Sequence, residues 1–368
     1  RVVVAYSTRK VYYVAPPSYR PADGSMGDGS LDAPFTTAFA DLFANVLSDG
    51  DLLRLFPGRY SGSSYCNLVV TKAVGVDSIG GPDRTIVDCL GTFRGWQLAH
   101  VRGLTTITGI TFTQCTVASN VHGAALWISG PTVLHQCRFV HNTDGIGIVA
   151  VVAPSASRLV DCEFELNVGR SALAILSATV TVADSRFLNN TSIGTEEIVV
   201  VTRYEGTGGA NVLGNPASAT VSNCTFARNS GAAALGLKFS SNAVVTNCSF
   251  LSNQAGGITV FAAMLVFTFN SAQDNNTTGL LGTVGGSITS TWNVFDSNRA
   301  DYGGAVFVTA ATSFLSNSAG PDSSTTDFTT TFTGGAISFQ NGAHIDFKSN
   351  LFRGNSASTA GGASTFPA

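Results

Sequence analysis

The chain of 368 residues has a formal net charge of −3, with 44% hydrophobic and only 12% charged residues. This balance gives no reason to expect a nucleic-acid partner, and the lack of an apolar run of about 18 residues predicts no membrane span in this chain. Gly, Ser, Thr and Asn take the place of the missing charges, so we expect strands and turns with few helices.

The first 65 residues predict a strand, a loop and a short helix. Val2–Val14 alternates and is rich in aromatic residues, which favours a leading strand, and Ala15–Gly29 is a loop rich in Pro, Gly and Asp. Apolar residues at helical spacing predict a helix within Thr36–Leu47, and Asp49–Tyr60 predicts a strand with a tight turn. In a solenoid, such a helix would cover the open end of the first coil and block edge-to-edge association.

The rest of the chain repeats the phrase Cys137-Arg138-Phe139-Val140-His141-Asn142. The phrase returns with its Cys at Cys162, Cys224 and Cys248, and looser copies keep only Phe-x-x-Asn, including Phe267/Asn270. The copies that predict a structural ladder are Phe139/Asn142, Phe164/Asn167, Phe187/Asn190, Phe226/Asn229, Phe250/Asn253, Phe295/Asn298, Phe314/Asn317 and Phe352/Asn355.

The spacing of the copies predicts the fold class, an all-β right-handed parallel β-helix solenoid with a short N-terminal capping helix. Successive Phe residues such as Phe139 and Phe164 are 25 residues apart, and Phe226 and Phe250 are 24 apart. Further apolar runs precede and follow each phrase, which gives three short strands per period. Stacked coils would align the Phe residues in one column, and the Asn side chains at a corner would bond along the axis.

We expect one continuous domain, with residues 1–65 as its N-terminal strand, loop and capping helix. Residues 66–368 would form the coils and continue beyond the last residue. Two gaps between copies are each longer than a coil, and they predict insertions within 195–218 and 320–333 that leave the solenoid at a turn.

The seven cysteines lack the spacing of metal sites. One interpretation makes them small buried residues in a column. The other makes them disulfides between adjacent coils, because a stacking distance of about 4.8 Å lies within the Cα range of a bridge. Cys137–Cys162 and Cys224–Cys248 are the first candidate pairs, and Cys66–Cys89 or Cys89–Cys115 come next.

Six Asn-x-Ser/Thr sequons are compatible with a secreted eukaryotic glycoprotein. They lie at Asn189, Asn190, Asn223, Asn247, Asn275 and Asn276. Asn223 and Asn247 share one position of the repeat, directly before a Cys, and we expect them to face outward.

The N-terminal segment resembles that of pectate-lyase-like right-handed β-helix proteins. The matching residues are Asp32-Ala33-Pro34-Phe35, Gly50-Asp51 and Pro57-Gly58-Arg59-Tyr60. The resemblance covers about 40 residues and implies that this segment caps the first coil.

The repeats themselves resemble those of the chlamydial polymorphic outer membrane proteins, over residues 112–366. Phe-x-x-Asn is paired there with Gly-Gly-Ala, which occurs here at Gly303-Gly304-Ala305, Gly334-Gly335-Ala336 and Gly361-Gly362-Ala363. Earlier coils depart from this pattern, and the barrel of an autotransporter is not present in this chain. The resemblance implies a surface-displayed module with an adhesive role.

The best candidate for a catalytic site is an acidic strand with Asp161, Glu163 and Glu165. Alignment of the Phe column places Arg138 on one side of Glu163 and Arg186 on the other. A polysaccharide lyase or glycosidase would use such carboxylates as acid, base or Ca²⁺ ligands. The alternative, which we favour, is a surface ladder of opposite charges across strands.

The other titratable residues are weaker candidates for a functional site. We interpret Glu196, Glu197, Arg203 and Glu205 as solvated loop charges, and Asp77, Asp83 and Asp88 as turn residues. The five His residues show no metal-ligand spacing, so no metal site is predicted.

The sequence therefore favours a non-enzymatic role, as a structural or adhesive glycoprotein that is secreted or at the cell surface. The expected partners are other protein subunits or cell-surface components, with carbohydrate as a further class. The alternative is a polysaccharide lyase or glycoside hydrolase for an acidic polysaccharide, and no cofactor is expected except Ca²⁺ under that alternative. A third interpretation is carbohydrate binding without catalysis by exposed aromatic residues such as Tyr204 and Trp292.

Overall fold

The computed structural model shows an all-β parallel β-helix solenoid, as the repeat predicts. It describes residues 9–19, 27–99, 103–118, 121–143, 145–152, 156–193, 197–202, 217–231, 233–239, 241–254, 257–261, 263–277, 281–284, 287–300, 306–309, 337–340, 344–348, 351–353 and 356–357. The chain forms two compact units, residues 1–181 and 182–368, and each is described by itself.

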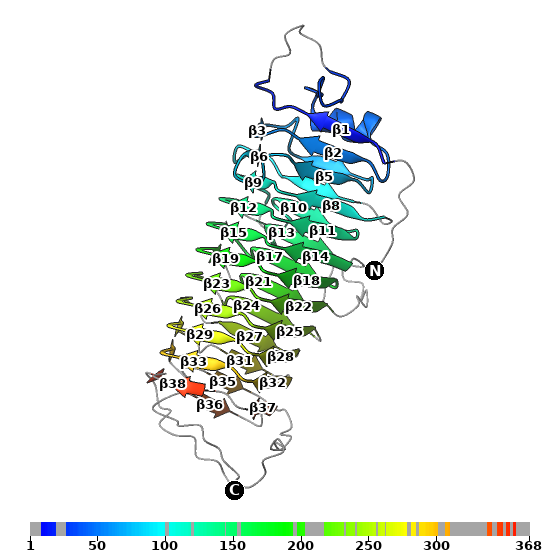
Figure 1. Ribbon diagram of the computed structural model, residues 1–368. Coiled ribbons are helices and arrows are strands. Elements are labelled where there is room, and N and C mark those ends of the chain that lie inside the picture. The colour runs from blue at the N-terminus through cyan, green and yellow to red at the C-terminus, as the bar shows by residue number, and fades with distance from the viewer. Residues whose placement is uncertain are drawn as a thin grey trace. The chain divides into compact units, whose positions relative to one another are not determined.

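In the first unit, three parallel sheets form the walls of the coils (Figure 1). Sheet A consists of β1 (Val11–Val14), β2 (Leu52–Leu55), β5 (Gly75–Ser78), β8 (Thr105–Thr108), β11 (Thr132–His135) and β14 (Ala156–Val160). Sheet B consists of β3 (Gly58–Ser61), β6 (Thr85–Asp88), β9 (Thr111–Thr113), β12 (Arg138–Val140) and β15 (Glu163–Glu165). Sheet C consists of β4 (Leu68–Val70), β7 (Trp96–Leu98), β10 (Leu126–Ile128), β13 (Val149–Val152) and β17 (Leu173–Leu176), and the short β16 (Val168–Gly169) lies outside these sheets.

The predicted helix is present but short. It consists of α1 (Phe39–Asp41) followed by a turn of π-helix, η1 (Leu42–Val46), and Ala38 precedes it without a side-chain cap. The Phe39 ring packs on those of Tyr60 and Trp96, with centroids 5.1 and 5.7 Å apart. The helix therefore buries its apolar face on the first coils, as expected of a cap.

The second unit continues the same three-strand coil. Strand β18 (Thr179–Ala183) contains the boundary. Sheet A consists of β22 (Ser218–Ser222), β25 (Asn242–Thr246), β28 (Met264–Thr268), β32 (Ser287–Thr291) and β37 (His344–Lys348). Sheet B consists of β19 (Arg186–Leu188), β23 (Thr225–Ala227), β26 (Ser249–Leu251), β29 (Ser271–Gln273), β33 (Val294–Asp296) and β38 (Leu351–Arg353). Sheet C consists of β21 (Val199–Thr202), β24 (Leu235–Lys238), β27 (Ile258–Phe261), β31 (Leu281–Val284), β35 (Val306–Thr309) and β36 (Ile337–Gln340). Shorter strands are β20 (Thr191–Ser192), β30 (Asn276–Thr277), β34 (Arg299–Ala300) and β39 (Ser356–Ala357).

The N-terminal segment is part of the first unit. Strands β2 and β3 pair with β5 and β6 of the following coil, so residues 1–65 share sheets with the coils after them. Of the predicted insertions, residues 195–196 and 203–216 of the first and all of the second lie outside the described residues.

A column of buried Phe rings forms the core beneath sheet B. In the first unit the Phe139 centroid lies 4.8 Å from that of Phe164, and in the second unit the Phe226 centroid lies 4.8 Å from that of Phe250. Phe187 pairs with Phe226, while Ala272 stands between Phe250 and Phe295 in the register. Phe352 aligns with Phe295 by backbone pairing, and Phe314, Asn317 and Asn355 lie outside the described residues.

Candidate functional site

Two corners flank sheet B, and each carries its own column of side chains. The first, which we call the amide corner, follows the strands of sheet B and holds the Asn of each repeat. In the second unit, Asn229 Oδ1 accepts hydrogen bonds from the Asn190 backbone N–H at 3.0 Å and from Asn190 Nδ2 at 3.2 Å. Asn229 Nδ2 donates to Asn253 Oδ1 at 2.9 Å and to the Phe187 carbonyl at 2.9 Å. The ladder thus satisfies buried polar groups on three consecutive coils.

The ladder continues with Asn275 and Asn298, and in the first unit Asn142 and Asn167 make the same bonds. The prediction that Phe267 and Asn270 are a copy of the same repeat position is wrong. Phe267 lies on β28 of sheet A, so Asn270, three residues later, reaches the opposite corner. Asn275 takes the expected place in the ladder although Ala272, not Phe, precedes it by three residues.

The second corner, which we call the thiol corner, precedes the strands of sheet B. Its buried side chains are Cys137 and Cys162 in the first unit, and Ser185, Cys224, Cys248, Asn270 and Asn293 in the second. The preferred disulfide candidates are therefore wrong, because Cys137, Cys162, Cys224 and Cys248 are all free thiols. Hydrogen bonding to the neighbouring Cys137 thiol, followed by burial, raises the pKa of Cys162, so this thiol stays protonated. The same causes raise the pKa of Cys224 beside Cys248.

The disulfide of the described residues joins Cys66 and Cys89, one coil apart. Cys115 is the next residue in this column, and its Sγ lies 3.2 Å from Cys89 Sγ. Burial, and then the nearby Asp88 carboxylate, raise the pKa of Cys115. Cys115 takes the place of an Asn in the ladder, since its backbone N–H donates to Asn142 Oδ1 at 2.9 Å.

The acidic strand forms ion pairs. Glu163 is 6% exposed, and its Oε1 lies 2.9 Å from both Nε and Nη2 of Arg138. Arg138 also bonds to Asp83 through Nη1. The opposite-charge pairing that the sequence favours is therefore present at Arg138 and Glu163, although the Glu163 side chain is buried.

The other acids of the strand differ in exposure. Asp161 lies before β15, at a turn with φ of 53°, and is exposed, whereas Glu165 is half-buried. Arg186 opens β19 of the second unit and is exposed. Within the described residues there is no group of three or more His, Cys, Asp or Glu able to hold a metal ion.

Two further charge assignments were wrong. Glu197 is buried, not solvated, and its Oε2 lies 2.9 Å from Lys238 Nζ. Its carboxyl group packs over Gly236, where a Cβ would come within 2.2 Å of Glu197 Cδ. Asp77 and Asp88 are strand residues and not turn residues. Asp77 forms an ion pair with Arg54, and Asp88 forms one with Arg59. Glu196, Arg203 and Glu205 lie outside the described residues, as does Tyr204.

The sequons divide between the corners. Asn190 and Asn275 are buried in the amide ladder, which excludes a glycan on them in the folded chain. Asn223 and Asn247 lie on the outside of the thiol corner and are exposed, as expected. Asn189 is half-buried and accepts a hydrogen bond from Arg228, and nothing is described for the side chain of Asn276.

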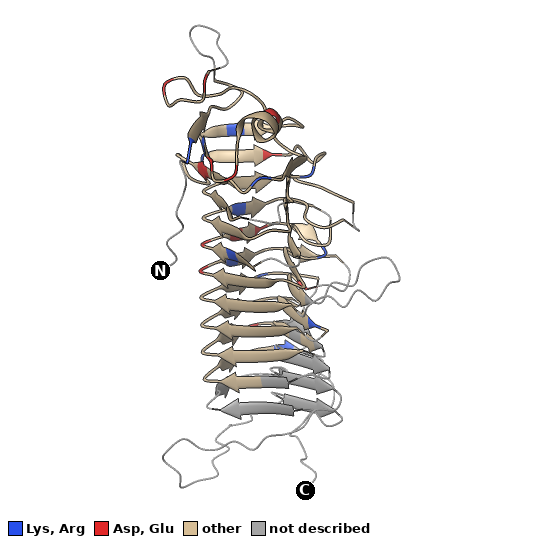
Figure 2. Ribbon diagram, turned by 90° about the vertical axis from the view of Figure 1, so that its right-hand side faces the viewer, with Lys and Arg blue, Asp and Glu red and all other residues tan. Residues whose placement is uncertain are grey.

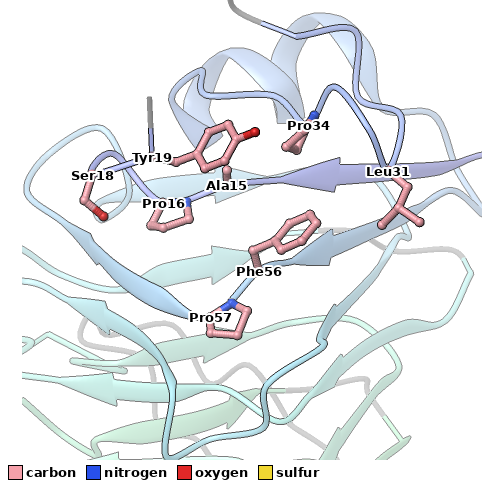
Figure 3. A pocket seen from close by; sticks show the side chains of 8 residues that line it. All are labelled: Ala15, Pro16, Ser18, Tyr19, Leu31, Pro34, Phe56 and Pro57. Carbon is pink, nitrogen blue, oxygen red and sulfur yellow. The ribbon is translucent and has the colours of Figure 1, made fainter. Parts of the chain in front are cut away.

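A pocket of about 290 Å³ lies near the N-terminal cap (Figure 3). Its lining is mostly proline and apolar side chains, and it offers no carboxylate, imidazole or amine as an acid or base. The lining residues are Ala15, Pro16, Ser18, Tyr19, Leu31, Pro34, Phe56 and Pro57.

Four adjacent strands of sheet A in the second unit are uncharged, whereas the next strand, β37, contains His344, Asp346 and Lys348. Strands β22, β25, β28 and β32 contain no Asp, Glu, Lys, Arg or His. The arrows of β22, β25 and β28 are accordingly tan in Figure 2. Val244, Met264 and Val266 are exposed on this face, with Met264 reaching 58%. In the first unit the same sheet carries Arg54, Asp77 and Arg158.

Comparison with known proteins supports the fold. A family model described as the right-handed beta helix region matches residues 199–319, and a comparison with curated proteins found no match. Structural similarity extends to a mannuronan C-5 epimerase A-module of Azotobacter vinelandii, at 13% identity, a TM-score of 0.38, and coverage of 88% of this chain and 94% of that chain.

A GH136 lacto-N-biosidase from Eubacterium ramulus shows 10% identity and a TM-score of 0.40, over 92% of this chain and 68% of that chain. A PL6 family polysaccharide lyase from Pseudopedobacter saltans shows 13% identity and a TM-score of 0.40, over 81% of this chain and 66% of that chain. No helix in the described part of the chain is long and apolar enough to cross a membrane.

Proposed function

We propose that the protein is a structural or adhesive solenoid module that is secreted or displayed at the cell surface, where it contacts other subunits of an assembly. The uncharged face that β22, β25, β28 and β32 form in sheet A of the second unit carries this proposal. The resemblance of the repeats to surface-displayed passenger domains supports the same role.

The face offers aligned rows of short side chains. Thr220, Val244, Val266 and Thr289 follow one another across the strands, as do Ser222, Thr246, Thr268 and Thr291. Val244, Val266 and Met264 lie on neighbouring strands, and contiguous exposed apolar groups are typical of an interaction surface. A partner that covers these rows desolvates no charge, and two copies can approach face to face without like-charge repulsion.

Sedimentation velocity over a range of protein concentrations tests this role. We expect association that Val266→Glu weakens, because the variant places a charge in the centre of the face. Thr106→Glu, at an outward position of sheet A in the first unit, is the matched control and should leave association unchanged. An unassociated wild-type protein, or equal effects of the two variants, would contradict a contact through this face.

The alternative is a polysaccharide lyase or glycoside hydrolase, for which the exposed Asp161 and the half-buried Glu165 lie on either side of Glu163, the ion-pair partner of Arg138. A screen on pectin, alginate and other uronic-acid polymers, with and without Ca²⁺, separates the two functions. Turnover that Glu163→Gln abolishes, in a variant with unchanged thermal unfolding, would overturn the non-enzymatic proposal.

A further inference from the structure

Two aromatic side chains stand exposed on the outside of the thiol corner in the second unit. Phe269 is 60% and Trp292 is 54% exposed. Their ring planes lie within 8° of parallel, with centroids 6.5 Å apart. Both residues have a left-handed backbone, with φ of 56° and 58°. That conformation favours Gly, Asn or Asp and disfavours bulky side chains, so neither local backbone preference nor burial explains the two rings.

Most groups around the rings are polar and uncharged, and the flanking strand β33 adds the carboxylate of Asp296. One coil before Phe269, Asn247 Nδ2 donates to Asn223 Oδ1 at 2.7 Å, and both amides are exposed. Thr268 and Thr291 precede the two rings, and Ser271 and Val294 follow them in register. The flanking strands β28, β29, β32 and β33 contain no Lys or Arg.

We propose that Phe269 and Trp292 form a stacking platform for a neutral saccharide chain, an inference that rests on the adhesive function proposed above. A sugar ring has an apolar C–H face, which packs on an aromatic ring, and a rim of hydroxyl groups, which the threonines and the Asn247 amide can bond. Within the flanking strands β28, β29, β32 and β33 an acidic saccharide finds no cation, and the Asp296 carboxylate of β33 repels it. Lys348 of β37 lies one strand beyond, in register with Thr291. The platform therefore selects neutral over uronic-acid chains.

Tryptophan fluorescence reports on this platform because Trp96 is buried and Trp127 only half-exposed. The probes are neutral cello- and laminari-oligosaccharides, with oligogalacturonate as the acidic counterpart. We expect the neutral chains to change the emission of Trp292 and to bind more tightly than the acidic one. Calorimetry, which does not need Trp292, should show that Trp292→Ala and Phe269→Ala each weaken binding on the order of tenfold.

Leu166→Ala is the matched control. Leu166 is also exposed, with a left-handed backbone, but it lies on the amide corner of the first unit, and its removal should leave binding unchanged. The proposed platform would be refuted by any of three results. These are no binding of either neutral series, binding of oligogalacturonate as tight as that of the neutral chains, and binding that survives Trp292→Ala. If these results occur while Val266→Glu still weakens association, the saccharide inference fails and the adhesive function stands.

The three sulfur atoms of the first unit support a second, independent inference. Cys115 Sγ lies 3.2 Å from Cys89 Sγ, which is bonded to Cys66, and all three residues are buried. We infer that the disulfide can move to Cys89–Cys115 by exchange. The Cys115 thiol loses its proton and attacks Cys89 Sγ, the Cys66–Cys89 bond breaks, and Cys66 leaves as a thiolate that takes up a proton.

Peptide mapping without reduction tests the exchange. Cys66→Ser, oxidised with glutathione disulfide, should form a Cys89–Cys115 bridge, whereas Cys115→Ser should retain Cys66–Cys89. Wild-type protein should gain the Cys89–Cys115 bridge at alkaline pH, where the attacking thiolate is more abundant. Two free thiols in Cys66→Ser, or an unchanged bridge in the wild type at every pH, would overturn the inference.

Discussion

The two corners of sheet B differ in what fixes their side chains. At the amide corner of the second unit, the Asn residues point inward and satisfy backbone groups of the neighbouring coils. On the outside of the thiol corner, Asp184, Asn223, Asn247, Phe269 and Trp292 occupy equivalent left-handed positions. The first column keeps one residue type because its bonds are buried, whereas the second varies from acid to amide to aromatic. A solenoid can thus acquire a binding surface at one corner without loss of the bonds at the other.

The largest expected effect comes from the same substitution made at both corners. Asn229→Asp removes the amide that donates to Asn253 Oδ1 and to the Phe187 carbonyl, and it buries a charge. Since a buried group without its partner costs about 1–3 kcal/mol, we expect the free energy of unfolding to fall by more than about 3 kcal/mol. Urea unfolding at neutral pH measures the loss.

Asn247→Asp is the control for this substitution. It lies on the outside of the thiol corner, where Asp184 already holds an equivalent left-handed position, so we expect a change within about 0.5 kcal/mol. Equal losses in the two variants would show that burial does not separate the corners.

A smaller effect is expected for the inner side of the thiol corner. Cys248→Ala leaves a small void and should cost about 1 kcal/mol. Cys248→Asn should cost less, because the next two coils hold Asn270 and Asn293 at this position, and Asn270 Nδ2 donates to the Val245 carbonyl at 3.0 Å. Urea unfolding of both variants gives the comparison. A larger loss for Asn than for Ala would mean that the position of Cys248, between Cys224 and Asn270, does not accept an amide.

The sequence could predict the repeat but not every position within it. The column of Phe139 and Phe164 follows from their spacing, because each coil adds a similar number of residues. The same Phe-x-x-Asn spacing misplaced Phe267, since a strand of sheet A followed by a turn produces it as well as a strand of sheet B. The Cys66–Cys89 bridge was one of several pairs one coil apart, and sequence spacing cannot rank pairs that are equally close in a stack.

The candidate site was predicted less well, for a related reason. Exposure depends on what packs over a residue, so Glu197 seemed to be a loop charge although it packs over Gly236 and pairs with Lys238. The Phe269–Trp292 platform was missed as a pair because the two residues are one coil apart in sequence. The sequence did hold a signal, since both occupy the repeat position that Asn223 and Asn247 fill in earlier coils.

The smallest effect on stability is expected from glycans on the outside of the thiol corner. Expressed in a secreting eukaryotic host, the protein should carry glycan at Asn223 or Asn247, whose side chains are exposed, and none at Asn190 or Asn275, whose amides are bonded in the ladder. Peptide mapping with and without glycosidase measures occupancy, and removal of the glycan should shift the free energy of unfolding by less than about 0.5 kcal/mol. Glycan found at Asn190 or Asn275 of the folded protein would contradict the buried ladder, because a modified amide nitrogen cannot bond to both the next Asn and a backbone carbonyl. Occupancy confined to Asn223 and Asn247 would show that the outer column is accessible during folding and after it, as a binding surface must be.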